Sequence, residues 1–355
     1  MRAGRCEQTA GRARRASGAI ALVVALLAAP PGSARPHQST LQPFGPAAGD
    51  IALLWWVMLI GAVAIFIGVM ALVLAGLRQR SAPSTLGSRV FIVGGGLVFP
   101  GVVLTALLVY TVAVGARLTA PAPRDALHIE ITGYMWWWEV RYRGLAGSTD
   151  DGATVVSANE VRIPVGRPVH LSLRSADVIH SFWVPNLAGK MDMIPGRTNR
   201  LVIQADAPGT YRGQCAEFCG TQHAQMALHV VAEAPDAWDA WFGSRRRALV
   251  AASGGGDALL TPTQQRGRAV FITAGCGACH GLAGVAAPPR GIAPDLTHVG
   301  SRPSLGAGLL ANTPGNLAAW IADAQQLKPG SKMPPFHGLR GDELTALTAY
   351  LGTLQ

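Results

Sequence analysis

The stretch Gly213–Met226 reads GQCAEFCGTQHAQM and places two cysteines, a histidine and a methionine close together. The upstream segment DVIHSFWVP adds another histidine, His180, on a predicted strand. Thiolates, imidazoles and a thioether are the ligands of copper electron-transfer sites, where soft sulfur selects the metal. Zinc also accepts cysteine and histidine but gains nothing from a methionine, and a disulfide is the usual alternative for close cysteines in exported chains. The residues favour a site in which two thiolates bridge a pair of copper ions.

The composition places part of the chain in lipid. Its 355 residues are enough for two or three domains, and only 14% of them are charged while 49% are hydrophobic. Half of the formal net charge of +10 comes from residues 1–35, which hold six arginines and one glutamate. Because no basic patch with interleaved aromatic residues occurs, no nucleic-acid partner is expected.

The N-terminal third has the pattern of an exported membrane protein. Residues 1–35 combine an arginine-rich start, the apolar run GAIALVVALLAA and small residues, which predicts a secretory signal peptide, with a retained anchor as the alternative. Residues 45–117 are predicted to form a transmembrane hairpin, because the stretches 51–77 and 90–116 are uncharged and long enough to span a bilayer. The arginines between them place that connection in the cytoplasm and the rest of the chain outside.

The remaining chain is predicted to hold two soluble domains. Short segments with period-two alternation over residues 121–245 predict a small β-sandwich or barrel, closed by a short amphipathic helix. Residues 246–258 contain AASGGGD and are predicted to be a flexible linker. Residues 259–355 show helical spacing and predict an all-helical domain, whose last helix is expected to open at Asp342.

The helical domain carries a second constellation. The motif CGACH at Cys276–His280 is the signature of covalent c-type haem, in which the thiols of Cys276 and Cys279 attach to the haem vinyl groups and His280 ligates the iron. Met333 in GSKMPPF is predicted as the second axial ligand, because His/Met ligation raises the potential for electron transfer, and His298 is the competing candidate.

Two further residues of the helical domain are expected around the haem. Trp320 is predicted to line it, together with the segment PDLTHVGSR, and Arg302 in that segment is predicted to meet a propionate. The helical domain would therefore hold its haem through both covalent and electrostatic contacts.

The pattern C-x-E-x-C-x-x-x-H-x-x-M, following DVIHSFWVPNLAGKMDMIPGR, closely resembles subunit II of cytochrome c oxidase over about residues 45–245. The resemblance implies a cupredoxin-like β-domain behind a two-helix hairpin, with a binuclear copper centre called CuA. The side-chain ligands that it implies are His180, Cys215, Cys219, His223 and Met226. Glu217 would supply CuA with a backbone carbonyl, and its carboxylate would bind a magnesium ion at the interface with subunit I.

The resemblance extends to the stretch GYMWWWEVRY and to the helical domain. A similar stretch in the family forms the aromatic patch through which electrons enter CuA, and Trp136 matches its first tryptophan, whereas Trp137 and Trp138 are expected to pack. Residues 259–355 resemble a class I cytochrome c domain. The whole multidomain chain is therefore similar to the fused subunit II of caa-type oxidases.

Two departures from the family are visible. The segment VGGGLVFP, ending at Pro100, lacks the glutamate and the Trp-Thr pair of many relatives, so the proton entrance is expected to differ or to come from another subunit. Tyr134 and Met135 stand where the family commonly has histidine and glutamine. Neither departure touches the predicted metal ligands.

The predicted function is that of subunit II of a terminal cytochrome c oxidase in a bacterial plasma membrane, with both metal domains on the outer side. Electrons would pass from an external donor such as cytochrome c through the haem to CuA and on to subunit I, where O2 is reduced to water with proton translocation. Subunit III and membrane lipid are further expected partners. The alternatives are the electron-input subunit of a CuA-containing nitric oxide reductase, and a membrane-anchored copper carrier or redox sensor.

Overall fold

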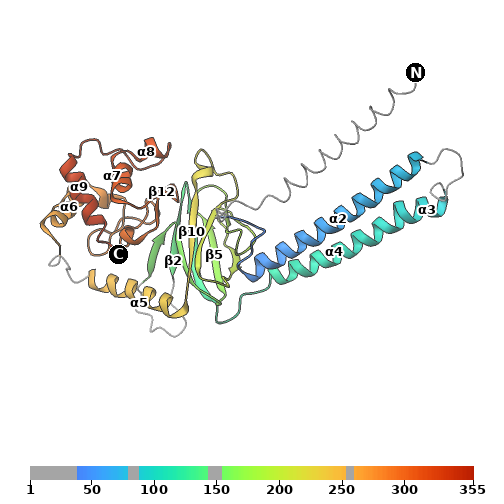
Figure 1. Cartoon of the computed structure of the whole chain (residues 1–355). Helices are drawn as coiled ribbons and strands as arrows, with labels where there is room; N and C mark the ends of the chain where they lie inside the picture. Colours follow the sequence, from blue (N-terminus) through green and yellow to red (C-terminus); the bar gives the residue numbers. More distant parts are fainter. Residues whose placement is uncertain (1–37, 79–87, 143–153, 253–259) are drawn as a thin grey trace, which may run out of the picture. The chain divides into compact units, whose positions relative to one another are not determined.

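The computed structural model describes residues 38–78, 88–142, 154–252 and 260–355, apart from the side chains of residues 248–252. Within these residues the chain forms a pair of long apolar helices, a β-sandwich and a helical domain (Figure 1). This arrangement confirms the predicted fold class. The predicted signal peptide, residues 1–35, lies outside the described residues.

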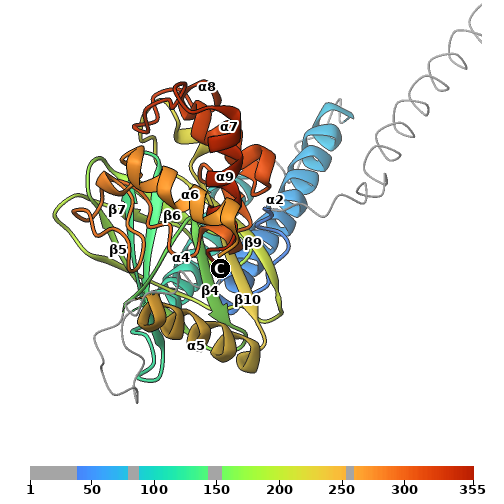
Figure 2. The ribbon, with the colours of Figure 1, turned by 90° about the vertical axis from the view of Figure 1, so that its left-hand side faces the viewer.

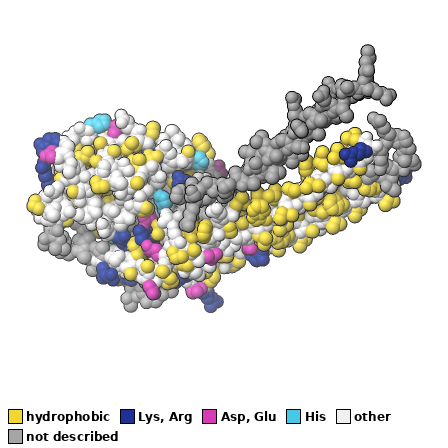
Figure 3. Space-filling view, viewed as in Figure 1, with side chains coloured by type: hydrophobic (Ala, Val, Ile, Leu, Met, Phe, Trp, Pro, Cys, Tyr) yellow, Lys and Arg dark blue, Asp and Glu magenta, His cyan; other side chains and the backbone are white. Residues whose placement is uncertain are grey.

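The helical hairpin consists of α2 (Pro46–Arg78) and a second run made of α3 (Arg89–Val93), the π-helical η2 (Gly94–Val98) and α4 (Phe99–Leu118). Both runs extend slightly beyond the stretches 51–77 and 90–116, and both are long and apolar enough to cross a membrane. Figure 3 shows hydrophobic side chains along these helices. Ile60 and Phe66 of α2 are each 65% exposed. So continuous an apolar surface is stable in lipid rather than in water.

The π-helical turn explains the unusual segment before Pro100. Pro100 has no N–H to donate to the carbonyl group four residues earlier, and Gly94, Gly95 and Gly96 tolerate the wider turn because they carry no side chains. The segment therefore continues the helix rather than ending it.

The β-sandwich consists of two five-stranded sheets with the strand orders β3-β2-β1-β5-β8 and β4-β10-β9-β6-β7. The strands are β1 (Leu127–Tyr134), β2 (Trp137–Tyr142), β3 (Val155–Ala158), β4 (Glu160–Pro164), β5 (Val169–Ser175), β6 (His180–Trp183), β7 (Met191–Met193), β8 (Asn199–Ile203), β9 (Gly209–Cys215) and β10 (Ala227–Glu233). Alternate residues such as Leu127, Ile129 and Ile131 of β1 are buried between the sheets. The pairs β1–β5 and β4–β10 are parallel, which brings residues distant in sequence together.

The helix α5 (Pro235–Ala252) follows the sandwich and packs against β3 and β4 (Figure 2). Its Trp238 is 1% exposed and stacks on Phe242 with ring centroids 5.2 Å apart. The predicted linker 246–258 therefore begins too early, since residues 246–252 are helical. The run RRRALVAA consists mainly of good helix formers, and the next glycine after it is Gly254.

The helical domain, here called the haem domain (residues 260–355), is built around α6 and α9. Its elements are α6 (Pro262–Thr273), η5 (Cys276–Ala278), η6 (Val299–Ser301), β11 (Ser304–Leu305), β12 (Leu310–Ala311), α7 (Pro314–Ala322), α8 (Ala324–Leu327) and α9 (Gly341–Leu351). Gly267 of α6 lies so close to α9 that a Cβ atom there would be 2.0 Å from the Ala346 carbonyl oxygen. Asp342 lies in the first turn of α9, which begins one residue earlier than expected.

Candidate metal centres

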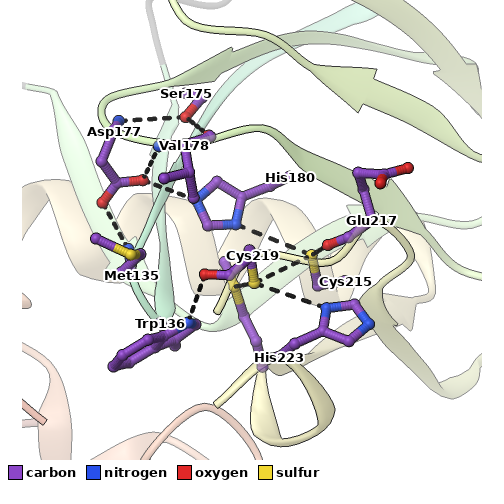
Figure 4. A network of polar contacts seen from close by, with 11 residues as sticks. Met135, Trp136, Ser175, Asp177, Val178, His180, Cys215, Glu217, Cys219 and His223 are labelled. Carbon is purple, nitrogen blue, oxygen red and sulfur yellow. Dashed lines mark hydrogen bonds and ion pairs between the residues drawn. The ribbon is translucent and has the colours of Figure 1, made fainter. Parts of the chain in front are cut away.

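The predicted copper ligands come together at one end of the sandwich. His180 begins β6, Cys215 ends β9, and the loop from Cys215 to Met226, here called the copper loop, carries the rest (Figure 4). His180, Cys215, Cys219 and Met226 are each at most 3% exposed. Potential ligand atoms of His180, Cys215 and Cys219 all lie within 4.8 Å of one another.

The contacts within this cluster form a continuous chain. The Cys215 and Cys219 Sγ atoms lie 3.7 Å apart, and Cys215 Sγ lies 3.9 Å from His180 Nδ1. Cys219 Sγ lies 3.6 Å from His223 Nδ1 and 3.8 Å from Met226 Sδ. Each sulfur is thus flanked by one imidazole, and the methionine lies beside Cys219.

The spacing of the two sulfur atoms suits a shared metal ion. A disulfide requires an S–S distance of about 2.05 Å, so Cys215 and Cys219 are not bonded to each other. Metal–thiolate bonds of about 2.3 Å allow two bridging sulfurs to lie up to about 4.6 Å apart. The donor set of two thiolates, two imidazoles and one thioether matches soft copper ligation.

The surroundings of the two cysteines also favour one thiolate, which is the form that binds a metal cation. The hydrogen bond from Cys219 lowers the pKa of Cys215 to about 3, and the contact with His180 acts in the same direction. The same hydrogen bond and burial raise the pKa of Cys219, so the pair shares one proton. Copper binding would replace that proton, because thiolate rather than thiol is the metal ligand.

Asp177 fixes the orientation of His180. The Asp177 Oδ1 atom lies 2.8 Å from His180 Nε2, which leaves Nδ1 directed at Cys215 (Figure 4). Burial opposes ionisation of Asp177, but hydrogen bonds from His180 and from the Met135 and Val178 amides together lower its pKa. A side chain at Gly133 would come within 2.9 Å of His180 Cδ2, so glycine leaves the space for the ring. Such a carboxylate partner is typical of metal-binding histidines.

The backbone carbonyl oxygen and the side-chain carboxylate of Glu217 point in different directions. Its carbonyl oxygen lies 3.1 Å from Cys215 Sγ, within the cluster. Its side chain is exposed, and Figure 4 shows the carboxylate pointing away from the sulfur atoms. The carbonyl is therefore placed for the copper cluster, and the carboxylate is free to face outward.

Trp136 contacts the copper loop directly. Its indole Nε1–H donates a hydrogen bond of 2.9 Å to the Cys219 carbonyl oxygen. Gly220, with a φ of +113°, allows this approach, since a Cβ atom there would lie 3.1 Å from the Trp136 ring. Trp137 instead stacks on Tyr134, and Trp138 is completely buried, so the three adjacent tryptophans have different environments.

The haem-attachment motif Cys276–His280 begins on η5, and its histidine is oriented by the backbone. His280 Nδ1 donates a hydrogen bond of 2.7 Å to the Pro294 carbonyl oxygen, which leaves Nε2 available to an iron ion. Burial lowers the pKa of His280, which favours the neutral form that binds metals. The motif therefore fits a covalently attached haem.

A cavity of about 420 Å³ adjoins this motif. The lining residues from the haem domain include Cys276, Cys279, His280, Arg302, Trp320 and Met333. His298 is not among them, since its Nδ1 lies 3.1 Å from the Gln355 carbonyl oxygen and 3.3 Å from Arg245 Nη1. Of the two candidate axial ligands, only Met333 lines the cavity with His280.

Arg302 and Trp320 complete the haem side of the cavity. The Arg302 side chain donates to the Asp295 carbonyl oxygen, while its buried Nε–H has no hydrogen-bond partner among the described residues. Burial lowers the pKa of Arg302, because a buried guanidinium ion loses its hydration. A buried cation of this kind is stabilised by an anionic partner. A haem propionate would satisfy this group.

The opposite wall of the cavity belongs to the β-sandwich. Met135, Trp136, Trp137 and Asn159 line the same space as the haem-attachment cysteines. Trp136 therefore faces both the cavity and, through its indole N–H, the copper loop. No local pattern in the sequence indicated this shared wall.

Three other features were not found from the sequence. Asp177 could have been suspected from its position three residues before His180. His128 and His170 are 42 positions apart in the sequence, and the parallel pairing of β1 and β5 places their rings 4.8 Å apart. Lys328 carried no motif, although only three of the thirty lysine and arginine residues are lysine.

The fold and the two sites together define a membrane-anchored electron-transfer protein with copper and haem cofactors. Residues 127–233 match the family described as cytochrome C oxidase subunit II, periplasmic domain, and residues 264–355 match the cytochrome c family. The chain therefore belongs to the cytochrome c oxidase subunit II family, in the form that carries a C-terminal cytochrome c domain. Its cofactors are CuA and haem c.

Several proteins are similar to this chain. Cytochrome c oxidase subunit 2 of Alkalihalophilus pseudofirmus is 37% identical over 234 residues, which cover 65% of this chain and 62% of that protein. The Bacillus sp. (strain PS3) protein of the same name is 30% identical, with coverages of 65% and 63%, so less than two thirds of either relative is matched. The Bacillus subtilis protein is 26% identical, with coverages of 95% and 96%.

Among solved structures, the periplasmic domain of subunit II of cytochrome oxidase from Bradyrhizobium japonicum is 27% identical to this chain. The match covers 36% of this chain and 98% of that one, with a TM-score of 0.32.

Proposed function

We propose that this chain is the electron-input subunit of a terminal cytochrome c oxidase. Electrons from an external donor such as cytochrome c would enter at the haem, cross by way of Trp136 to CuA, and continue to subunit I. There O2 is reduced to water with proton translocation. The chain itself carries electrons, and the O2-reducing site lies in subunit I.

The ligand sets follow from the two clusters. CuA is held by His180, Cys215, the Glu217 carbonyl, Cys219, His223 and Met226. The haem is attached to Cys276 and Cys279 and ligated by His280 and Met333, with Arg302 near a propionate and Trp320 against the ring. The Glu217 carboxylate holds a magnesium ion at the interface with subunit I.

The hairpin anchors these centres at the outer face of a bacterial plasma membrane. The arginines between its two helices remain in the cytoplasm, and the sandwich and haem domain lie on the other side. Subunits I and III and the surrounding lipid cover the apolar faces of α2 and α4. The exposed side chains of these helices support such an environment.

One observation carries the proposed route. Trp136 lines the cavity that holds the haem-attachment residues, and the same indole donates to the carbonyl oxygen of Cys219. A single aromatic side chain therefore contacts both sites. A copper carrier or sensor without turnover would not need this connection.

The route is tested by replacing Trp136 in the assembled complex. Trp136→Phe is expected to slow electron transfer from haem to CuA at least about tenfold, because it removes the contact with Cys219. The rate is measured as haem oxidation after rapid photoreduction. Trp137→Phe is the matched control, since Trp137 lines the same cavity but stacks on Tyr134. Equal rates in both variants would exclude Trp136 as the route.

The oxidase assignment has its own test. Purified complex is supplied with reduced cytochrome c and either O2 or nitric oxide. Donor-dependent O2 consumption that is lost in a Cys215→Ser variant supports the proposal. Turnover of nitric oxide alone would assign the chain to a nitric oxide reductase instead.

A further inference from the structure

Lys328 connects the haem domain to the β-sandwich. Its Nζ atom donates hydrogen bonds of 2.9 Å to the carbonyl oxygens of both Trp136 and Gln225, and one of 2.8 Å to that of Gly306. Two of these acceptors belong to the sandwich and one to the haem domain. The side chain thus lies where the haem cavity, the copper loop and Trp136 meet, and the residue is only 3% exposed.

The chemistry of this site suits lysine rather than arginine. An ammonium group is compact and carries three N–H donors, and each of them has a carbonyl acceptor here. The planar fork of an arginine would not fit three converging carbonyl groups. Burial lowers the pKa of Lys328 to about 8, so the side chain still holds its proton at pH 7. A buried, fully hydrogen-bonded cation is a strong positional constraint.

The residues next to Lys328 extend the contact. Gln222 of the copper loop donates a hydrogen bond of 2.7 Å to the Pro329 carbonyl oxygen. Gly330, with a φ of +84°, packs on the Trp136 ring, since a Cβ atom there would lie 3.3 Å from it. The turn Lys328–Gly330, here called the docking turn, therefore contacts Trp136 and two residues of the copper loop, Gln222 and Gln225.

A backbone hydrogen bond lies beside the docking turn. The Ala227 amide, which directly follows the copper loop, donates a hydrogen bond of 3.0 Å to the Ala307 carbonyl oxygen of the haem domain. Because this amide is satisfied only across the contact, its exchange with solvent reports whether the two domains are together.

We propose that Lys328 is the anchor of an intramolecular docking site, through which the haem domain binds to Trp136 and the copper loop. The partner of this surface of the sandwich is the chain's own haem domain rather than a separate protein. If the proposed function holds, the docking turn also keeps Trp136 at the wall of the haem cavity. An external donor must then approach the haem from a side other than the docked one.

Amine acylation of the intact full-length chain tests the anchor without using electron transfer. The chain has three lysines, and Lys190 and Lys332 are exposed, so they serve as internal references. Lys328 is expected to react with an acetylating reagent at least about tenfold more slowly than either, as measured by mass spectrometry. Since burial favours the reactive neutral amine, slow reaction can come only from inaccessibility. Reaction of Lys328 at the rate of Lys332 would overturn the proposal.

Substitution provides the second test. Lys328→Met keeps the length of the side chain but removes its donors, and it is expected to speed hydrogen exchange at the Ala227 amide at least about tenfold. Lys328→Arg is expected to behave similarly, and Lys332→Met is the matched control for loss of one positive charge. The Val230 amide, inside the sheet, reports whether the sandwich stays folded. Unchanged exchange at Ala227 in a folded Lys328→Met chain would contradict the anchor role.

These results are separable from the proposed function. If Trp136→Phe left electron transfer unchanged while Lys328 stayed protected, the route would fail and the docking site would stand. If Lys328 reacted freely while Trp136→Phe still slowed transfer, the route would stand and the anchor would fail.

Discussion

At the residue scale, the copper cluster depends on a side chain that is not itself a ligand. Asp177 accepts from His180 Nε2 at 2.8 Å and from the Met135 amide at 2.7 Å, so one carboxylate fixes both the imidazole and the segment that carries Trp136. Its negative charge also makes the imidazole a better donor to copper. Asp177 is therefore a positioning residue for CuA.

Replacing Asp177 with asparagine tests this role. Asp177→Asn keeps the shape of the side chain but removes its charge, and copper affinity is expected to fall about 10- to 100-fold. Affinity is measured by titration against a competing chelator. Asp192→Asn, which removes an exposed carboxylate on β7, is the control and is expected to leave affinity unchanged. Equal affinities in the two variants would show that the carboxylate does not support the site.

The clustering of the proposed copper ligands could be predicted because most of them are close in sequence. Cys215, Cys219, His223 and Met226 share one loop, so their types and spacing carry the chemistry without knowledge of the fold. Asp177 and the contact of Trp136 with Cys219 depend on strand pairing. The residues of that contact are 83 positions apart, and nothing in either local segment indicates the other.

At the element scale, the alternation of hydrophobic and polar residues in the sequence predicts the strands that bury one face. β1, β4, β5, β8, β9 and β10 correspond to segments with clear period-two patterns. The short strand β7 and the tryptophan-rich β2 do not show this pattern, because β7 has three residues and β2 has side chains buried on both faces. Tertiary pairing, rather than local preference, determines these two strands.

The crossing of α6 and α9 gives a sharp prediction for the haem domain. Gly267→Ala would place a methyl group 2.0 Å from the Ala346 carbonyl oxygen and 2.7 Å from Tyr350 Cβ, so the helices must separate. The free energy of unfolding is expected to fall by about 2 kcal/mol or more, since backbone atoms cannot rotate away. Urea unfolding followed by haem absorbance measures the change.

Gly315 of α7 is the matched control for this substitution. A Cβ atom there meets nothing within 4 Å. Gly315→Ala is expected to raise stability by up to about 1 kcal/mol through helix propensity alone. If Gly267→Ala were as well tolerated, close contact would not determine how α6 and α9 pack.

At the scale of the whole molecule, the contact between the domains uses groups that no sequence pattern marks. Lys328 binds backbone carbonyls, which every residue possesses, and the Ala227 amide binds another. The predicted flexible linker would let the two domains reach each other, but a linker does not specify which faces meet. Only the three-dimensional structure reveals that Trp136 belongs to both sites.

The contact of α5 with the haem domain is expected to weaken in acid. Burial lowers the pKa of His298 to about 4, and the nearby charge of Arg245 acts in the same direction. In the unfolded chain a histidine has a pKa of about 6.5. The unfolded state therefore binds the proton first, and stability present above about pH 6.5 is lost as the pH falls through about 4. Urea midpoints measured from pH 7 to pH 4 should fall less in His298→Gln than in the natural chain.

The control for this experiment is His337→Gln in the same domain. The His337 side chain is 69% exposed and pairs with Asp323, away from Arg245. This variant is expected to keep the pH dependence of the natural chain. A His298→Gln chain with an equally steep loss of stability would assign the acid sensitivity to other groups.

The two metal centres are adjacent yet share no proposed ligand, which predicts how the chain responds to loss of copper. The proposed copper ligands lie between His180 and Met226. The proposed attachment cysteines and axial ligands of the haem lie between Cys276 and Met333, and Trp136 contacts the surroundings of both sites. Removing copper with a chelator should therefore leave the haem absorbance spectrum unchanged.

Electron uptake should nevertheless fall by half when copper is removed from the isolated chain. Haem c and CuA each accept one electron, so the loaded chain takes up twice as many reducing equivalents as the depleted one. Anaerobic titration with a calibrated reductant, followed by haem absorbance, measures this uptake, and added copper should restore it. A chain whose uptake did not change with copper content would have no redox-active centre at Cys215 and Cys219, and the proposed path from haem to subunit I would have no second step.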